Sequence, residues 1–211
     1  MKIGLLGGTF NPVHIGHLIL AEEAREKLGL DKIIFIPTAL PPHKDNLNIA
    51  PAKDRLKMLK LAVASNKFFA VSDIEIKRGG RSYTIDTIKE LKRKNPLDSF
   101  YLIIGSDLIT YFEGWKDIDQ IAKAVTFVVA TRPGYPLENI GSYVAMQQAG
   151  VKTLAIRAVD VSGFEVRQCV AQNKSFGYLV TDKVFDYIKR RKLYRDGSQT
   201  KGKLSPKKGT L

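Results

Sequence analysis

Short apolar runs alternate with longer amphipathic segments along this 211-residue chain, and this alternation limits the fold more than any other feature of the sequence. Short apolar runs are typical of buried strands, and apolar residues three to four positions apart are typical of helices. The predicted strands are Lys2–Leu6, Lys32–Pro37, Phe68–Ile76, Ser99–Gly105, Val125–Ala130 and Lys152–Ala158. The predicted helices are Ile15–Leu28, Ala52–Ser65, Thr84–Lys94, Asp117–Lys123, Gly163–Asn173 and Thr181–Lys192.

Strands that alternate with helices predict right-handed βαβ units. The expected fold is therefore α/β, with a Rossmann-like, doubly wound and mainly parallel sheet. Ligands of such sheets bind at the carboxyl ends of the strands, near the point where the strand order reverses. The residues that directly follow each strand are therefore the first candidates for a functional site.

Composition favours one soluble domain over residues 1–195, because 44% hydrophobic and 26% charged residues are ordinary values for a globular protein. No apolar run reaches the roughly 18 residues that a membrane helix needs, so we expect no membrane partner. The single cysteine, Cys169, excludes an intrachain disulfide. A reducing compartment suits such a chain, and we expect it to be cytoplasmic.

The basic residues are concentrated near the C-terminus. The chain carries a formal net charge of +13, and the segment 189–211 has a large excess of lysine and arginine over its one acid, Asp196. Residues 196–211 are rich in Gly, Ser, Thr and Lys, which predicts a basic, disordered tail. Such a tail can bind nucleic acid electrostatically. A solvated extension is the favoured interpretation, because no aromatic residue alternates with the charges, and nucleic acid is not an expected partner.

The segment between the first predicted strand and the first predicted helix reads Gly7-Gly8-Thr9-Phe10-Asn11-Pro12-Val13-His14-Ile15-Gly16-His17. Histidines three residues apart lie on one helical face, and a helix N-terminus favours anions. The pattern predicts a phosphate site built from His14, His17 and backbone amides. Zinc binding is a weaker interpretation, because the third histidine is the distant His43 and no cysteine or acidic cluster completes a ligand set. Packing or capping histidines are the other alternative.

The four residues His14-Ile15-Gly16-His17 resemble the signature of the nucleotidyltransferase superfamily with HIGH-type motifs. The whole string from Gly7 to His17 resembles that of bacterial nicotinate-nucleotide adenylyltransferases, and the resemblance extends to about Arg195. It implies a nucleotidyltransferase of NAD biosynthesis. Such an enzyme joins ATP and nicotinate mononucleotide to give nicotinate adenine dinucleotide and pyrophosphate.

The resemblance also implies an ATP site formed by the segments after the first, fourth and fifth strands and by the start of the fifth helix. Its residues are Gly7, Gly8, Thr9, Phe10, His14, Gly16, His17, Gly105, Asp107, Arg132, Ser162 and Arg167, and catalysis is assigned to His14, His17 and Arg167. The family reads Ile-Ser-Ser-Thr-x-Ile-Arg where this chain reads Val161-Ser162-Gly163-Phe164-Glu165-Val166-Arg167. Two hydroxyl side chains are therefore absent here, whereas the backbone amides remain. Ser162 and Glu165 also predict a capping box.

For nicotinate mononucleotide, the resemblance implies contacts from Lys44, Tyr83, Thr84 and Trp115. Lys44 ends a Pro41-Pro42-His43-Lys44 loop, and Trp115 is the only tryptophan, which either stacks on the pyridine ring or belongs to the core. The segment Ser82–Thr87 opens a helix, with Ser82 or Thr84 expected as its N-cap. Amides at a helix start can hold the nicotinate carboxylate, which favours nicotinate over the uncharged nicotinamide.

The expected chemistry is in-line attack of a phosphate oxygen on the α-phosphorus of ATP, without a covalent enzyme intermediate. No carboxylate cluster suggests a protein-bound metal, so Mg²⁺ is expected to arrive with ATP. Three alternatives remain open: an adenylyltransferase for nicotinamide mononucleotide or phosphopantetheine, a nucleic-acid-binding module that uses the basic tail, and a catalytically silent nucleotide binder, which the replacements Gly163 and Phe164 suggest. Homo-oligomer formation also stays open.

Overall fold

The computed structural model describes residues 1–41, 49–106, 114–131, 150–157 and 159–195. The strands are β1 (Lys2–Gly8), β2 (Lys32–Pro37), β3 (Phe69–Val71), β4 (Ser99–Gly105), β5 (Thr126–Thr131) and β6 (Val151–Ala155). The helices are α1 (Ile15–Leu28), α2 (Ala52–Val63), α3 (Ile74–Arg78), α4 (Thr84–Lys94), α5 (Ile118–Ala124), α7 (Gly163–Ala171) and α8 (Asp182–Arg191). In the described part of the chain, no helix has the length and apolar character needed to cross a membrane.

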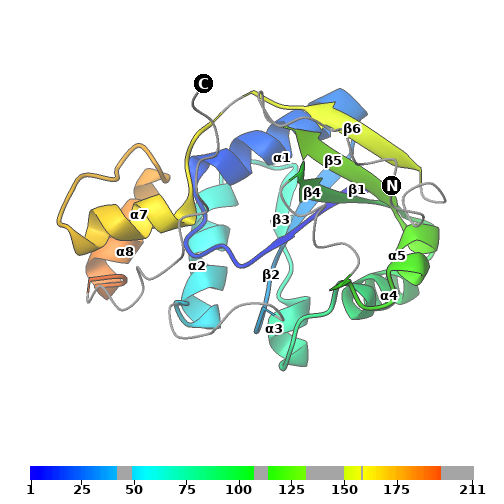
Figure 1. The fold of residues 1–211 in the computed structure, drawn as a ribbon, viewed down its shortest axis with the longest axis horizontal. Coiled ribbons are helices and arrows are strands. Elements are labelled where there is room, and N and C mark those ends of the chain that lie inside the picture. Colours follow the sequence, from blue (N-terminus) through cyan, green and yellow to red (C-terminus); the bar gives the residue numbers. More distant parts are fainter. Residues whose placement is uncertain (42–48, 107–113, 132–149, 158, 196–211) are drawn as a thin grey trace, which may run out of the picture.

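The six strands form one sheet in the order β3-β2-β1-β4-β5-β6, and every neighbouring pair is parallel (Figure 1). The predicted α/β fold is therefore confirmed, and the sheet is entirely parallel. The strand order reverses between β1 and β4, so the ligand-binding position of such a sheet lies where these two strands end. The loop that opens at Gly7 and Gly8 leaves the sheet at this point.

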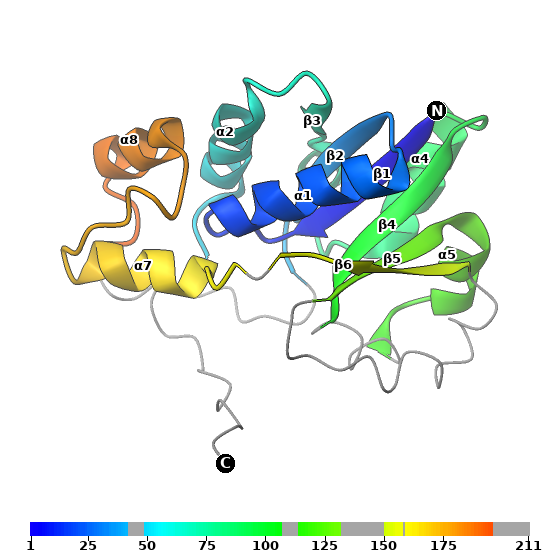
Figure 2. The same ribbon diagram turned by 90° about the horizontal axis from the view of Figure 1, so that it is seen from above.

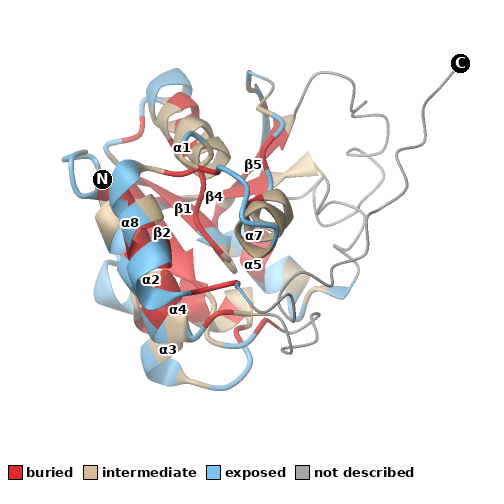
Figure 3. Cartoon of the chain, turned by 90° about the vertical axis from the view of Figure 1, so that its left-hand side faces the viewer, coloured by how far each residue is buried: buried red, intermediate tan, exposed pale blue. Residues whose placement is uncertain are grey.

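Helices cover both faces of the sheet (Figure 2). Because successive strand residues point to opposite faces, neighbours along β5 enter different cores: Val128 joins the cluster shared with α1, α2 and α8, whereas Phe127 and Val129 join the cluster shared with α4 and α5. Helix α8 packs against α2. Figure 3 shows that these two helices carry exposed faces outward while the strands behind them are buried.

One predicted strand is wrong in part. The apolar run Phe68–Ile76 contains the short strand β3, which ends at Val71, and its second half is the helix α3. Asp73 stops the strand: its carbonyl accepts a hydrogen bond from the Lys77 amide at 2.8 Å, and its carboxylate pairs with the Lys77 ammonium at 3.1 Å. Local polar contacts at Asp73 therefore override the strand pattern of the apolar residues. The other element boundaries differ from the predicted ones by at most three residues.

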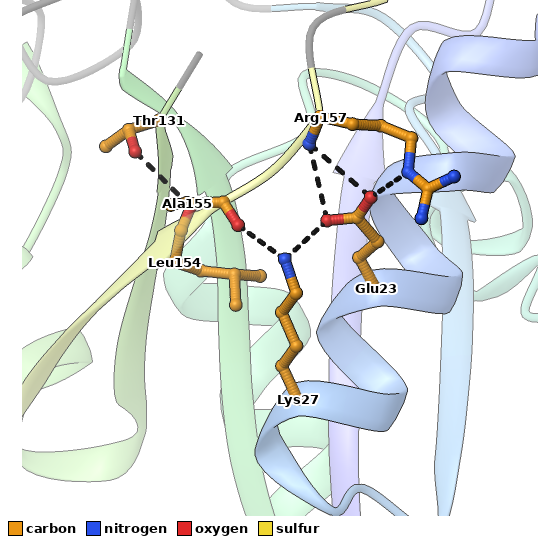
Figure 4. A network of polar contacts seen from close by, with 6 residues as sticks. All are labelled: Glu23, Lys27, Thr131, Leu154, Ala155 and Arg157. Carbon is orange, nitrogen blue, oxygen red and sulfur yellow. Dashed lines mark hydrogen bonds and ion pairs between the residues drawn. The ribbon is translucent and has the colours of Figure 1, made fainter. Parts of the chain in front are cut away.

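A polar network joins the edge strand β6 to α1 (Figure 4). The buried Glu23 carboxylate accepts hydrogen bonds from Lys27 at 2.7 Å and from Arg157, and Lys27 also donates to the Ala155 carbonyl at 2.7 Å. The hydrogen bond from Lys27 is the main cause that lowers the pKa of Glu23. Arg157 precedes α7 in the sequence, so its contact with Glu23 holds the segment that leads into α7 next to α1.

Candidate phosphate-binding site

The loop after β1 is tightly packed and contains a residue in the left-handed backbone region. Phe10 has a φ of 47° and is 2% exposed. A Cβ atom on Gly8 would lie 3.3 Å from the Phe10 ring, which explains the glycine at this position. A non-glycine residue keeps a positive φ where its surroundings hold it, so this loop has one fixed shape.

The two histidines predicted to bind phosphate lie together at the start of α1. His14 is the N-cap residue, and its backbone amide donates to His17 Nδ1 at 3.2 Å. The two ring centroids are 3.7 Å apart, and the Phe10 ring meets His17 edge-on at 4.9 Å. Because Nδ1 of His17 accepts a hydrogen bond, the proton of a neutral ring lies on Nε2, which is then a donor.

The backbone amides of α1 contribute less than the sequence predicts. The Ile15 amide donates to the Leu179 carbonyl, and the His17 amide donates to the His14 carbonyl, both at 3.0 Å. Two of the backbone donors predicted at this helix start are therefore used within the protein, and the imidazole side chains remain as candidate donors.

Gly16 allows α1 and the segment before α7 to approach each other. A Cβ atom at this position would lie 3.1 Å from His14 Nδ1 and 3.7 Å from the Val161 carbonyl oxygen. A larger residue would press on the His14 ring. The glycine therefore serves the packing of His14 as well as the access of a ligand.

The second predicted phosphate motif reaches the same loop from the other end of the chain. Ser162 caps α7, because its side chain accepts the Glu165 amide at 3.1 Å. Arg167 Nη1 donates to the Asn11 carbonyl at 2.6 Å. A Cβ atom on Gly163 would lie 2.9 Å from that carbonyl oxygen, so a serine would not fit here without a shift. The departure from the family pattern thus lets α7 approach the loop closely.

The first turn of α7 offers backbone donors. Within the described residues, the amides of Gly163 and Phe164 make no hydrogen bond, since the first amides of a helix have no partner in the helix itself. Burial lowers the pKa of Arg167, but a guanidinium starts from so high a value that the group stays charged. The amides and the guanidinium of α7 therefore lie against the loop that leads to His14 and His17, and we call this region the phosphate corner.

Sequence reasoning misses Arg55, which the structure places beneath this corner. Its guanidinium is 1% exposed and donates to the carbonyls of Ala50 at 2.9 Å, Thr9 at 2.7 Å, and Thr38 and Ala39 at 2.7 and 3.1 Å. These carbonyls belong to the loops after β1 and β2 and to the entry of α2. The available signal was its spacing: Arg55 lies three and four residues before the buried Met58 and Leu59, on the apolar face of α2.

The predicted nicotinate region is built differently in one detail. Neither Ser82 nor Thr84 caps α4: the N-cap is Tyr83, and the Ser82 hydroxyl instead accepts the Ala39 amide at 2.9 Å. Among the described residues, no side chain caps the first turn of α4. Its first amides, those of Thr84 to Asp86, make no hydrogen bond there, which leaves donors for an anion.

Tyr83 and Trp115 come from distant parts of the sequence to the same side of the sheet. Both are partly buried and pack against the core cluster that contains α4 and α5. The Lys116 ammonium lies 4.8 Å from the centroid of the Tyr83 ring. The structure therefore places the only tryptophan at the edge of the core and next to the predicted nicotinate region, a position that suits both interpretations of this residue.

Some predicted site residues lie outside the described part of the chain: Lys44, Asp107 and Arg132, together with the basic tail 196–211. Gly105 is described, and it ends β4 beside β1. The described residues contain no group of three or more His, Cys, Asp or Glu side chains that could hold a metal ion.

Comparison with known proteins gives consistent results. A family model described as cytidylyltransferase-like matches residues 5–169. A probable nicotinate-nucleotide adenylyltransferase of Rubrobacter xylanophilus is 38% identical and covers 97% of both chains. The corresponding protein of Lactiplantibacillus plantarum is 41% identical and covers 92% of this chain and 88% of its own.

A solved structure shares the fold. It is the nicotinic acid mononucleotide adenylyltransferase of Plasmodium falciparum complexed with NaAD, with a TM-score of 0.76. The alignment covers 92% of this chain and 97% of that one, at 17% sequence identity. At this identity, the comparison establishes the fold alone.

Proposed function

Because this chain belongs to the nicotinate-nucleotide adenylyltransferases of the cytidylyltransferase-like family, we propose that it transfers the adenylyl group of ATP to nicotinate mononucleotide. The products are nicotinate adenine dinucleotide and pyrophosphate, a step of NAD biosynthesis. The observation that carries this function is that Arg167 of α7 donates to the Asn11 carbonyl, in the loop that leads to the paired rings of His14 and His17, although 150 positions separate His17 from Arg167. The named relatives support nicotinate mononucleotide, and not phosphopantetheine, as the acceptor.

The residues suit in-line transfer between two anions. A phosphate oxygen of nicotinate mononucleotide attacks the α-phosphorus of ATP, a new O–P bond forms, and the bond to the β-phosphate oxygen breaks. The attacking oxygen is already anionic, so no side chain needs to remove a proton. The protein has to hold the two phosphates in line and neutralise their charge, and orientation alone can contribute about 7–11 kcal/mol.

We assign the donors by their position in the site. His17 Nε2 stabilises charge on the α-phosphate, whereas His14 and Arg167 hold the β- and γ-phosphates with the amides of Gly163 and Phe164. We propose that Mg²⁺ enters as part of the ATP substrate and neutralises the same phosphates. Asp107 and Arg132 remain predicted contacts for ATP, and Lys44 for nicotinate mononucleotide.

The start of α4 supplies the proposed nicotinate site. The amides of Thr84 to Asp86 can donate hydrogen bonds to the nicotinate carboxylate, and the rings of Tyr83 and Trp115 lie on the same side of the sheet. Nicotinamide carries no negative charge that the start of this helix could stabilise. These residues therefore support a preference for the acid over the amide. We further propose that the protein acts in the cytoplasm.

Isotope labelling tests the chemistry directly. ATP labelled at the α-phosphate should transfer its label to nicotinate adenine dinucleotide, whereas label at the γ-phosphate should appear in pyrophosphate, with both products formed in equal amounts. Chromatography of the products after incubation with Mg²⁺ and nicotinate mononucleotide measures this. Label from the γ-phosphate in the dinucleotide fraction, or release of inorganic phosphate in place of pyrophosphate, would contradict adenylyl transfer.

A further inference from the structure

Asn11 joins four segments of the chain at the edge of the phosphate corner. Its side-chain Oδ1 accepts hydrogen bonds from the Ala50 amide and from the Tyr194 hydroxyl, both at 3.0 Å. Its backbone carbonyl accepts the bond from Arg167 Nη1 at 2.6 Å. The loop after β1 is thus tied to the entry of α2, to α7, and to the residues that follow α8.

Two of the residues around Asn11 have backbones that need support from their surroundings. Phe10, its neighbour in sequence, has a φ of 47°, and Tyr194 has a φ of 65°. A left-handed conformation is unfavourable for residues other than glycine and persists where other contacts hold it. The hydrogen bond between Tyr194 and Asn11 connects these two segments, so each helps to fix the other.

Burial keeps the Tyr194 hydroxyl a neutral donor. The residue is 1% exposed, and this burial raises the pKa of its hydroxyl above the ordinary value. The positive charges of Arg167 and Arg55 act in the opposite direction and lower that pKa, but burial is the larger cause. The hydroxyl therefore donates to Asn11 over the whole physiological pH range.

We propose that Tyr194 is a positioning residue for adenylyl transfer, because its hydroxyl fixes Asn11, and the Asn11 carbonyl in turn orients the Arg167 guanidinium toward the triphosphate. This inference rests on the proposed role of Arg167 in ATP binding. A planar guanidinium recognises phosphate in a directional way, so a change in its orientation weakens binding even though its charge stays in place. Tyr194, which follows α8, thus affects ATP binding indirectly: it contacts Asn11, and Asn11 contacts Arg167.

Removal of one hydroxyl tests the proposal. Tyr194→Phe should raise the KM for ATP about 3- to 10-fold, the effect of one lost hydrogen bond, and should change kcat by less than about twofold. The KM for nicotinate mononucleotide should stay unchanged. Asn11→Ala should raise the KM for ATP by at least as much. The double variant should be no worse than Asn11→Ala alone, because both changes interrupt the same connection.

Tyr187→Phe is the matched control. Tyr187 lies on α8, is buried, and donates its hydroxyl to Asp54 at 2.7 Å and not to Asn11. Loss of the Tyr187 hydroxyl should lower the thermal midpoint but leave the KM for ATP within about twofold of the wild-type value. Equal effects of the two tyrosine variants on this KM, or an unchanged KM in Tyr194→Phe and in Asn11→Ala, would overturn the proposal.

Arg167→Ala separates this inference from the function on which it rests. If Arg167→Ala leaves the KM for ATP unchanged, the assignment of Arg167 to the triphosphate is wrong, and the role of Tyr194 falls with it. If Arg167→Ala raises the KM and Tyr194→Phe does not, the ATP-binding role stands and the positioning role of Tyr194 is wrong. The proposal requires that both variants raise the KM, with the larger effect for Arg167→Ala.

Discussion

Replacement of His17 by alanine should lower kcat for adenylyl transfer about 10²–10³-fold, the usual effect of losing one preorganised donor. His17 is held by the His14 amide at Nδ1 and by the edge of the Phe10 ring, so its Nε2 donor has a fixed direction before ATP binds. Steady-state kinetics with saturating ATP and nicotinate mononucleotide measure this effect, and circular dichroism verifies the fold.

Glu26→Ala is a suitable control for the His17 variant. Glu26 lies on the same helix, and its side chain is 64% exposed. We expect its kcat to equal that of the wild type. A correctly folded His17→Ala protein whose kcat stays within about threefold of the wild-type value would show that His17 does not stabilise the transition state.

Replacement of Arg55 by methionine should give the largest loss of stability in the molecule. The side chain of similar length fills the space but leaves the carbonyls of Thr9, Thr38 and Ala50 buried without their donor. Each buried acceptor left unsatisfied costs about 1–3 kcal/mol, so the free energy of unfolding should fall by at least about 3 kcal/mol. For a chain of this size, that loss lowers the thermal midpoint by roughly 6–12 °C, which calorimetry measures.

Arg93→Met on α4 provides the comparison, because that arginine is exposed. Its thermal midpoint should shift by no more than about 2 °C. The thermal midpoint of Arg55→Lys should lie between those of Arg55→Met and Arg93→Met, since one ammonium cannot reach all the carbonyls that the guanidinium spans. Equal thermal midpoints for Arg55→Met and the wild type would show that the four hydrogen bonds contribute nothing net.

The sequence predicts the fold well because two strong local signals agree. Apolar runs such as Ile33–Pro37 and Leu102–Ile104 are largely buried in a parallel sheet covered on both faces, so their strands appear as continuous apolar segments. The prediction for Phe68–Ile76 fails because Ile74 and Ile76 alternate with a polar residue as in a strand, whereas the local hydrogen bond at Asp73 begins a helix there. Such a hydrogen bond depends on geometry that periodicity does not contain.

The site is predictable where its chemistry resides in contiguous motifs. His14, His17, Ser162 and Arg167 are found in this way, and the structure brings them to one loop. Arg55 and Tyr194 carry no motif of their own, and Asn11 lies within the first motif without a role that the motif reveals: each acts through hydrogen bonds to segments far away in sequence. Their roles follow from the folded contacts alone. Similarly, the Ile15 amide at the start of α1 donates to the Leu179 carbonyl, and the sequence gives no sign that this distant residue occupies it.

The central claim is best tested by initial rates of pyrophosphate release from ATP and Mg²⁺ with three acceptors in parallel: nicotinate mononucleotide, nicotinamide mononucleotide and phosphopantetheine. We expect kcat/KM to be at least about tenfold higher with nicotinate than with nicotinamide mononucleotide, because the start of α4 favours a carboxylate by about 1–2 kcal/mol. Phosphopantetheine should give no release. Equal rates with the two mononucleotides would contradict the carboxylate site at α4, and release with none of them would contradict the proposed function as a whole.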